Sequence, residues 1–398
     1  MRCVIPVFLS LTIGCEPAFA QERNESIQEE VLRYPVKENG KWGFIDSTGR
    51  VAIDSRYDGA DWFQSGLAAV NFGGGGGELF RGGKWGYIDI SGKEIIPFQF
   101  DDARSFIDGY AAVGVASADS SSRDGLPIIK WGFINKAGKT VVRPRFDDVR
   151  YSSESLAWMR SGEFWGLIDM SDKMRTGLDF RDVLPFSEGR AWVKDKRYGW
   201  GIIDTSGTLI RPCNLSLRSI TGFHEGLTVV GTKDKHWLII DRNGTTVHDF
   251  SYDWVCPFEN GLARVTQNGK CVFIDRAGNV KFSTDYGWTG KTSEGLALVS
   301  KNDKYGYADS FTYELVIPEV FADAELFHHG FAVVTLEEDG MKGFIDHSGK
   351  VCIQPRFYTA SQFFGALARV GLKRSFGMFD QHWGYINTRG VVVWQSND

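Results

Sequence analysis

The sequence predicts an all-β protein built as a tandem array of about nine to ten short antiparallel β units. Glycine is frequent, with 47 of 398 residues, and aromatic residues reach 14%, a combination typical of short strands joined by tight turns. One pattern of strand and turn residues also recurs along the chain at intervals of 34 to 46 residues. With 42% hydrophobic residues the chain has enough apolar side chains for a large core, so wholesale disorder is excluded.

Each unit begins with a short aromatic strand containing Trp-Gly, as in residues 41–45, and an Asp then opens a turn. A Gly three residues later accepts a positive φ, so a hairpin follows. Pro often ends the return strand, because a residue without N–H cannot continue a ladder. The unit closes with Phe-x-x-Gly-x-Ala-x-Val, a turn into a strand with one buried face. The Trp-Gly glycine or its replacement stands at Gly43, Gly86, Gly132, Gly166, Gly201, Leu238, Val272, Gly306, Gly343 and Gly384.

The glycine beside each Trp implies that something large covers the backbone there, most simply an aromatic side chain. Leu238 and Val272, which replace the glycine, should break that contact. The Trp side chains themselves have two interpretations. Their recurrence at one register favours core packing, whereas exposed Trp would form platforms for sugars. Trp85 and Trp131 are the test cases.

The units resemble the WG (KWG) repeats of bacterial exported and surface proteins. The resemblance rests on Lys-Trp-Gly-Phe-Ile-Asp, Ser-Gly-Lys, Ile-x-Pro-x-Phe-Asp-Asp and Phe-x-x-Gly-x-Ala-x-Val, in family order over residues 32–394. It implies an all-β scaffold with a binding role and offers no catalytic residue to carry over. Regularity fails at Leu238, at Cys271-Val272 and over residues 250–257, so a division of the 21–398 repeat domain near 235–290 stays open.

The two ends of the array look complementary. Residues 32–38 resemble the last strand of a unit, and residues 383–394 supply only a hairpin. Together they would make one shared unit, which favours a propeller-like ring closed by its terminal strands. An open β-repeat spiral is the alternative, because ten units exceed the usual blade number and three strands per unit are evident rather than four.

The first 20 residues have the order of a secretory signal peptide. Arg2 precedes the apolar run 4–13, and Ala18-Phe19-Ala20 supplies a cleavage site. The mature chain is therefore expected to begin at Gln21 and to be exported to the periplasm, the cell surface or the medium. A lipid anchor at Cys15 is the alternative, because residues 12–15 resemble a lipobox. No later segment is apolar enough for a transmembrane helix.

Export leaves four cysteines in an oxidising compartment, where disulfides form. They are Cys213, Cys256, Cys271 and Cys352, and three pairings are open, with Cys256 to Cys271 the favoured one. CxxC spacing and nearby paired histidines are missing, so no zinc site, other metal site or cofactor is expected.

Motifs for chemistry have structural interpretations. His328-His329 fits a solvated turn, and the run 73–77 of glycines fits a hairpin tip. Recurrent Asp-x-x-Gly turns offer about one carboxylate each, too few for calcium. The acidic pairs Asp101-Asp102 and Asp147-Asp148 recur at one repeat position, so they indicate unit structure and not a glycosidase dyad.

These observations favour a non-enzymatic exported binding or scaffold protein that engages a protein or a cell-surface polymer through several units. A carbohydrate-binding protein or glycosidase, and a structural envelope spacer, are the alternatives. The net charge of -5 gives no support for a nucleic-acid partner. Catalytic and metal-binding residues are not predicted, and the ligand-binding residues and oligomeric state stay open.

Overall fold

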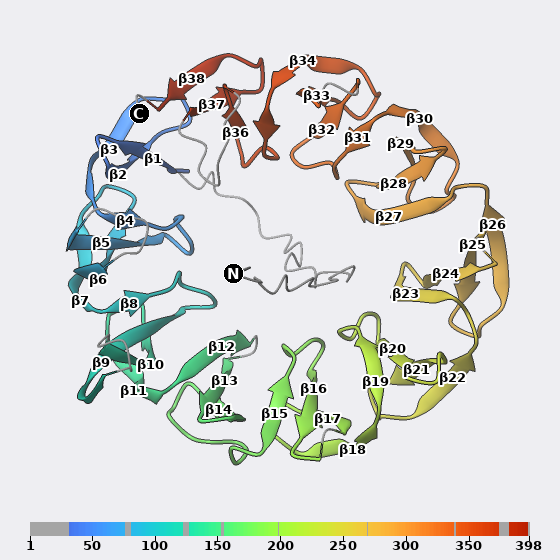
Figure 1. The fold of residues 1–398 in the computed structure, drawn as a ribbon, viewed down its shortest axis with the longest axis horizontal. Helices are drawn as coiled ribbons and strands as arrows, with labels where there is room; N and C mark the ends of the chain where they lie inside the picture. The colour runs from blue at the N-terminus through green and yellow to red at the C-terminus, as the bar shows by residue number, and fades with distance from the viewer. Residues whose placement is uncertain are drawn as a thin grey trace, which may run out of the picture.

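The computed structural model describes residues 32–75, 81–121, 127–152, 155–197, 199–268, 270–337, 340–373 and 382–396. These residues form strands and turns without a helix, which confirms the all-β class. Ten units follow one another around a ring with a central opening (Figure 1). Within the described residues no helix is long and apolar enough to cross a membrane. The signal peptide and Cys15 lie outside this part of the chain.

The strands fall into ten consecutive units. Units 1 to 3 contain β1 (Tyr34–Glu38), β2 (Lys41–Ile45), β3 (Val51–Tyr57); β4 (Gly59–Ala60), β5 (Leu67–Gly75), β6 (Arg81–Asp89), β7 (Glu94–Phe100); β8 (Asp102–Ala103), β9 (Tyr110–Ser121), β10 (Pro127–Asn135) and β11 (Thr140–Phe146). Units 4 to 6 contain β12 (Asp148–Ser152), β13 (Leu156–Ser161), β14 (Phe164–Asp169); β15 (Phe180–Val183), β16 (Arg190–Asp195), β17 (Trp200–Asp204), β18 (Leu209–Leu215); β19 (Leu217–Ile220), β20 (Leu227–Thr232), β21 (Trp237–Asp241) and β22 (Thr246–Phe250).

The remaining four units have four strands each. They contain β23 (Trp254–Glu259), β24 (Leu262–Gln267), β25 (Lys270–Asp275), β26 (Val280–Thr284); β27 (Trp288–Ser293), β28 (Leu296–Lys301), β29 (Lys304–Asp309), β30 (Leu315–Phe321); β31 (Asp323–Ala324), β32 (Ala332–Thr335), β33 (Lys342–Ile345), β34 (Val351–Phe357); β35 (Thr359–Ala360), β36 (Leu367–Gly371), β37 (Trp383–Asn387) and β38 (Val392–Gln395).

Each unit is an antiparallel meander whose first strand lies nearest the opening and whose last strand lies at the rim (Figure 1). Most units have four strands, where the sequence made only three evident, because several first strands are just two residues long. Units 4 and 5 share one seven-stranded sheet through the pairing of Trp165 with Phe180.

The Phe-x-x-Gly segment forms the hairpin between the first and second strands. Ser65 and Gly66 have φ values of 54° and 83°, and Gln64 and Leu67 exchange main-chain hydrogen bonds of 2.9 and 3.1 Å. Two consecutive positive φ values define the tight two-residue hairpin that matches strand twist. Glycine at the second position adopts this conformation without steric cost, which explains its recurrence.

The glycine of Trp-Gly is covered by backbone, so the prediction of an aromatic cover was wrong. A Cβ on Gly43 would stand 2.6 Å from the carbonyl oxygen of Ile53 and 2.7 Å from the Ser55 nitrogen. The outer strand bulges at this point: Trp42 pairs with Tyr57 and Phe44 with Ile53, so three residues oppose one glycine. Only a residue without Cβ lets the bulge approach so closely.

Units 6 and 7 show the converse, as predicted for their substituted positions. Leu238 pairs with Asp249 and Val272 with Ser283, one residue to one, and neither outer strand bulges there. Both outer strands therefore have five residues, where bulged β3, β7 and β11 have seven. Proline is coupled to the bulge and occupies it in five units, as Pro97, Pro144, Pro212, Pro318 and Pro355.

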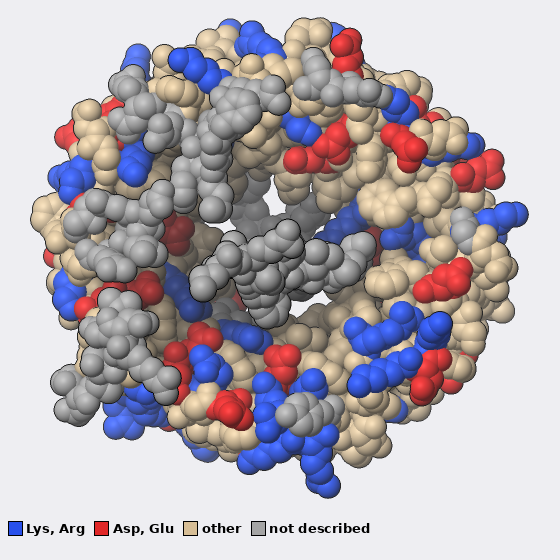
Figure 2. All heavy atoms as spheres, viewed as in Figure 1, with Lys and Arg blue, Asp and Glu red and all other residues tan. Residues whose placement is uncertain are grey.

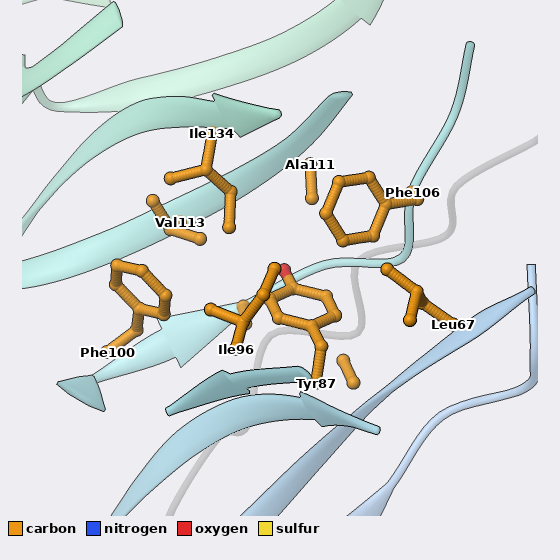
Figure 3. Packing of buried hydrophobic residues seen from close by; sticks show 10 residues of the cluster. Leu67, Tyr87, Ile96, Phe100, Phe106, Ala111, Val113 and Ile134 are labelled. Atoms are coloured by element: carbon orange, nitrogen blue, oxygen red, sulfur yellow. The ribbon is translucent and has the colours of Figure 1, made fainter. Parts of the chain in front are cut away.

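The hydrophobic core lies between successive units. Figure 3 shows one such junction, where Tyr87 and Ile96 of unit 2 pack against Phe106 and Val113 of unit 3. The rings of Tyr87 and Phe106 meet edge to face at 4.8 Å, and both are almost completely buried. The Phe of each hairpin thus fills the space against the preceding unit, while a small Ala on the second strand makes room for it.

The ring closes without a shared unit, so the predicted combination of terminal strands was wrong. β1 pairs with β2 in unit 1, and β37 pairs with β36 and β38 in unit 10. Side chains join the two units through a buried cluster that contains Tyr34, Val36, Leu367, Tyr385 and Trp394.

Unit 1 lacks the first strand and its hairpin, and one residue compensates for both. Tyr34 stands where other units have Ala or Thr opposite the Ile of Trp-Gly, as Ala68 stands opposite Ile88. Its ring lies 5.5 Å from that of Tyr385, the place that a hairpin Phe takes at other junctions. Tyr34 therefore fills the last junction from within β1.

Candidate functional site

The inner wall of the ring is the best candidate for a binding surface. It is built from the first strands, which lie side by side around the opening (Figure 1). In units 3 to 5 these strands are β8, β12 and β15. An Asp begins each of the first two strands, and Asp182 lies in the third.

Aspartate caps its own strand at this position. One carboxylate oxygen of Asp148 accepts the N–H of Val149 at 2.8 Å, and Asp102 and Asp182 make the same bond to the residue that follows. Burial raises the pKa of Asp102, because removal from water disfavours the charged carboxylate. Sequence analysis identified the acidic pairs but not this local role.

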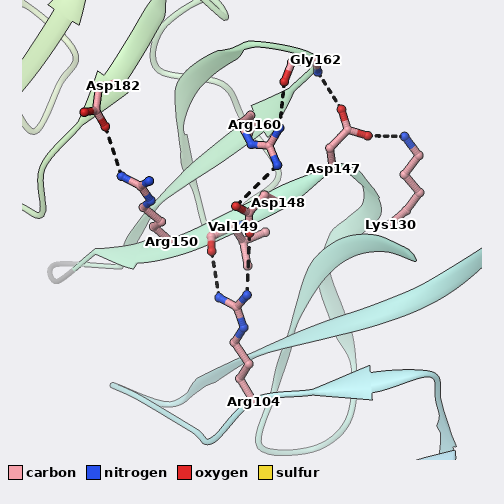
Figure 4. Close-up of polar contacts among 9 residues, drawn as sticks. All are labelled: Arg104, Lys130, Asp147, Asp148, Val149, Arg150, Arg160, Gly162 and Asp182. Atoms are coloured by element: carbon pink, nitrogen blue, oxygen red, sulfur yellow. Dashed lines mark hydrogen bonds and ion pairs between the residues drawn. The ribbon is translucent and has the colours of Figure 1, made fainter. Parts of the chain in front are cut away.

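Arginine connects the first strands of successive units (Figure 4). Arg104 donates to the carbonyl oxygen of Val149 at 2.8 Å and lies 3.7 Å from Asp148. Arg150 repeats this arrangement one unit further on, with 3.1 Å to the carbonyl oxygen of Val183 and 3.3 Å to Asp182. We call Arg104, Asp148, Arg150 and Asp182 the inner-wall strip.

Tryptophan supports the arginines of the strip. The guanidinium of Arg104 lies 4.4 Å from the centre of the Trp131 ring, and that of Arg150 lies 4.4 Å from the Trp165 ring. Stacking holds each guanidinium in place at small entropic cost. Both Arg side chains remain 49% exposed, so the strip presents fixed charges of both signs to the opening. Acidic and basic side chains both border the opening in Figure 2.

The Trp residues of the repeats belong to the core. Trp131, Trp165, Trp200, Trp237 and Trp383 are each less than 10% exposed, and Trp85 packs against the cluster of units 2 and 3. This arrangement confirms core packing for these side chains. It leaves only their covered faces toward the arginines, which excludes an open sugar platform at these positions.

The two acidic pairs separate in the structure. Asp147 receives Lys130 at 2.6 Å and the N–H of Gly162 in the next unit at 2.6 Å, whereas Asp148 faces Arg104 and Arg160. The Lys130 contact and the Gly162 N–H lower the pKa of Asp147. The carboxylates therefore hold units together, as their repeat position predicted.

The lysine of Lys-Trp-Gly has a role that sequence analysis missed. Lys84 reaches Asp101 at 2.7 Å, Lys130 reaches Asp147, and Lys41 reaches Asp58. Each Asp stands 17 residues after its Lys and also accepts an N–H from the following unit. The constant spacing of 17 was the available signal.

A second clasp between units also escaped sequence analysis. Glu188 in the hairpin of unit 5 accepts the N–H of Gly226 at 2.8 Å and binds Arg242 at 2.7 Å. Glu225 binds Gly261 and Arg276 in the same way, and Glu294 binds Gly330 with His347 in place of arginine. Burial opposes ionisation of Glu188, but Arg242 and the Gly226 N–H outweigh it and lower the pKa.

His328 and His329 occupy a hairpin tip, as predicted. His329 has a φ of 50° and is followed by Gly330, while His328 exchanges main-chain bonds with Phe331. Among the described residues no group of three or more His, Cys, Asp or Glu side chains is arranged to hold a metal ion. The glycine run 73–77 extends past the described residues.

The favoured Cys256 to Cys271 disulfide is wrong, because neither cysteine is in a disulfide. Arg264 intervenes: it donates to Cys256 Sγ at 2.8 Å and to Thr289 Oγ1 at 2.8 Å, and Cys271 Sγ lies 3.7 Å from that hydroxyl. Cys271 replaces the Trp of its unit, and Arg264 sits where Arg369 stacks on Trp383 in unit 10. Cys213 and Cys352 also form no disulfide.

Ten clasped β units around an opening define a ring-shaped β-repeat protein. The family model described as WG containing repeat matches residues 42–75, 85–115, 131–163, 165–196, 239–271, 273–305 and 343–372. The matches cover more than half of the chain, which therefore belongs to the WG-repeat family.

Solved structures with some likeness to the chain share little sequence with it. BamB from Moraxella catarrhalis is 12% identical, with a TM-score of 0.35 over 73% of this chain and 94% of that one. The computationally designed Ika8 protein is 13% identical, with a TM-score of 0.35 over 73% and 93%. The WD40 β-propeller domain of Doa1 is 12% identical, with a TM-score of 0.28 over 57% and 86%. No curated protein matches the chain.

Proposed function

We propose that this protein is a non-enzymatic exported scaffold that binds a protein or cell-envelope partner across several repeat units. The observation that carries the proposal is the inner-wall strip, where Arg104 and Arg150 alternate with Asp148 and Asp182 and are half exposed. Charges fixed by stacking and by bonds between units suit a ligand with spaced polar groups, because little ordering is needed on binding.

Export is part of the proposal and rests on residues 1–20. Cleavage after Ala20 would leave Gln21 as the first residue, whereas a lipid on Cys15 would anchor the protein to a membrane. Mass spectrometry of the secreted or envelope-associated protein separates the two outcomes, because a diacylated cysteine adds a large, specific mass. A cytoplasmic protein that retains residues 1–20 contradicts export.

The binding proposal is tested by capture from an envelope fraction with the purified ring as bait. The double variant Arg104→Gln and Arg150→Gln should lose the captured partner, while the fold survives because both side chains are half exposed. Arg143→Gln is the matched control, since Arg143 pairs with Asp172 on the outer strand β11 and is 79% exposed. Equal capture by all variants would contradict use of the inner wall.

The alternatives give different results in the same material. Binding on a glycan array by native and not by heated protein would replace the protein partner with a sugar. Hydrolysis of a glycoside would overturn the non-enzymatic assignment. Failure of every fraction to yield a specific partner would favour the structural envelope spacer.

A further inference from the structure

The outer strands of this ring are protected against edge pairing in most units, and the protection has a gap. Free strand edges invite pairing with another chain, and bulges or prolines blunt them. Bulges lie in β3, β7, β11, β18, β30 and β34, and Pro97, Pro144, Pro212, Pro318 and Pro355 stand in five of these six strands.

The gap falls in units 6 and 7, where Leu238 and Val272 replace the Trp-Gly glycine. Their outer strands β22 and β26 run one to one beside the inner neighbour at this point, and Asp249 and Ser283 take the place of the proline. β22 still has a charged guard, since Asp249 binds His236 at 2.8 Å and is 54% exposed. β26 has a neutral serine. In unit 10 the turn at Gly49 of unit 1 lies against the Val393 carbonyl.

The edge of β26 is also the most apolar place on the described surface. Phe311 is 63% exposed and Val280 is 60% exposed, the two highest values among large hydrophobic side chains. Val280 begins β26. Phe311 lies in the turn of unit 8 whose Tyr313 packs on Phe282, with ring centres 6.0 Å apart. β26 stands at the rim of the ring, away from the opening (Figure 1).

Main-chain direction makes β26 competent to pair. Asp275 donates its N–H to the carbonyl oxygen of Asn279 at 3.0 Å, which closes the β25 to β26 hairpin. Alternation along the strands then directs the main-chain groups of Phe282 and Thr284 toward β25. Those of Ser283, and of Lys281 on its other side, point to the open edge.

We propose that β26 pairs antiparallel with β26 of a second copy of this chain, with the two-fold axis at Phe282. Lys281 of each copy then faces Ser283 of the other, and these two pairs make four main-chain hydrogen bonds. Val280 faces Thr284, a favourable cross-strand combination. No like charges stand directly opposite, and Lys281 is already near Asp275, at 3.8 Å. Val280 and Phe311 lose exposed surface beside the new ladder.

The test imports the protection that other units possess. Ser283→Pro removes an outward N–H at the position of Pro97, and sedimentation velocity over a range of concentrations measures the mass. The wild-type protein should reach twice the mass of one chain, and Ser283→Pro should raise the dimer Kd by at least about tenfold, or about 1.4 kcal/mol. Asp54→Pro, the same change at the equivalent place in bulged β3, should dimerise like wild type.

A second pair of variants covers the case in which Ser283→Pro unfolds, as circular dichroism would reveal. Val280→Lys places a charge at the start of β26, and Val51→Lys is its equivalent in β3, where Val51 is 52% exposed. Val280→Lys should give a monomer and Val51→Lys a dimer. A wild-type protein that stays monomeric, or a dimer that survives both β26 substitutions, overturns the proposal.

Discussion

The hydroxyl of Tyr34 donates a 2.8 Å hydrogen bond to the carbonyl oxygen of Phe364, 330 residues further along the chain. The same oxygen accepts the N–H of Ala366 at 3.2 Å. Tyr34 is completely buried, and burial raises its pKa although these hydrogen bonds oppose the shift. One side chain from the first described strand thus binds the hairpin of the last unit.

We expect Tyr34→Ala to open the ring at this junction. Loss of a buried aromatic ring costs about 3 to 5 kcal/mol, and Tyr34→Phe, which loses only the hydroxyl, should cost about 1 kcal/mol. Urea unfolding measures both values. Hydrogen exchange should show the earliest loss of protection in β1 and at residues 364–366. Uniform exchange across the ring would contradict a role confined to closure.

Trp131→Ala tests the core assignment of the repeat Trp. Trp131 is 8% exposed, so its removal should lower the free energy of unfolding by about 3 to 5 kcal/mol. Lys139→Ala at an exposed position nearby should stay within about 0.5 kcal/mol. Units 3 and 4 should become more sensitive to protease, because adjacent repeats stabilise one another. Wild-type melting of Trp131→Ala would return the sugar-platform interpretation.

Gly86→Ala tests the backbone bulge. The new Cβ would lie 2.6 Å from the Ile96 carbonyl oxygen, so the outer strand must move and we expect a loss of about 2 kcal/mol or more. Gly287→Ala is the control, because its Cβ would meet only one atom, at 3.9 Å. Thermal unfolding separates the two variants, and equal melting would show that the bulge yields freely.

Acid should destabilise the ring through its clasps. Contacts with Lys130 and the Gly162 N–H lower the pKa of Asp147; burial opposes ionisation of Glu225, but Arg276 and the Gly261 N–H lower its pKa. The folded protein then binds fewer protons than the unfolded chain, so this stabilisation is present above the unfolded pKa values and is lost as pH falls through the folded ones. Urea midpoints should therefore fall below about pH 4.

The variant Asp147→Asn isolates one of these carboxylates. It should be less stable than wild type at pH 7, and its urea midpoint should fall less steeply on acidification. Asp54→Asn, on the outer strand and exposed, should follow the wild-type curve. Parallel curves for wild type and Asp147→Asn would show that this clasp contributes nothing to acid sensitivity.

Sequence alone determined the local features of this protein. Positive φ at Gly66 and the Asp46 to Gly49 turn follow from single residues whose conformational preferences act within a few positions. Repetition of those residues at a steady interval then established the number of units and the all-β class. Alternation of Ala68 and Val70 similarly marked a buried face, because strand side chains alternate with a period of two.

Tertiary structure decided what lies against what. Only the fold shows that backbone covers Gly43, that Lys84 reaches Asp101, and that Tyr34 closes a ring whose ends share no sheet. It also shows Arg264 between two cysteines that the sequence could pair. These relations depend on the angle and distance between successive units, which arise from the packing of many side chains together, and no local residue pattern encodes them.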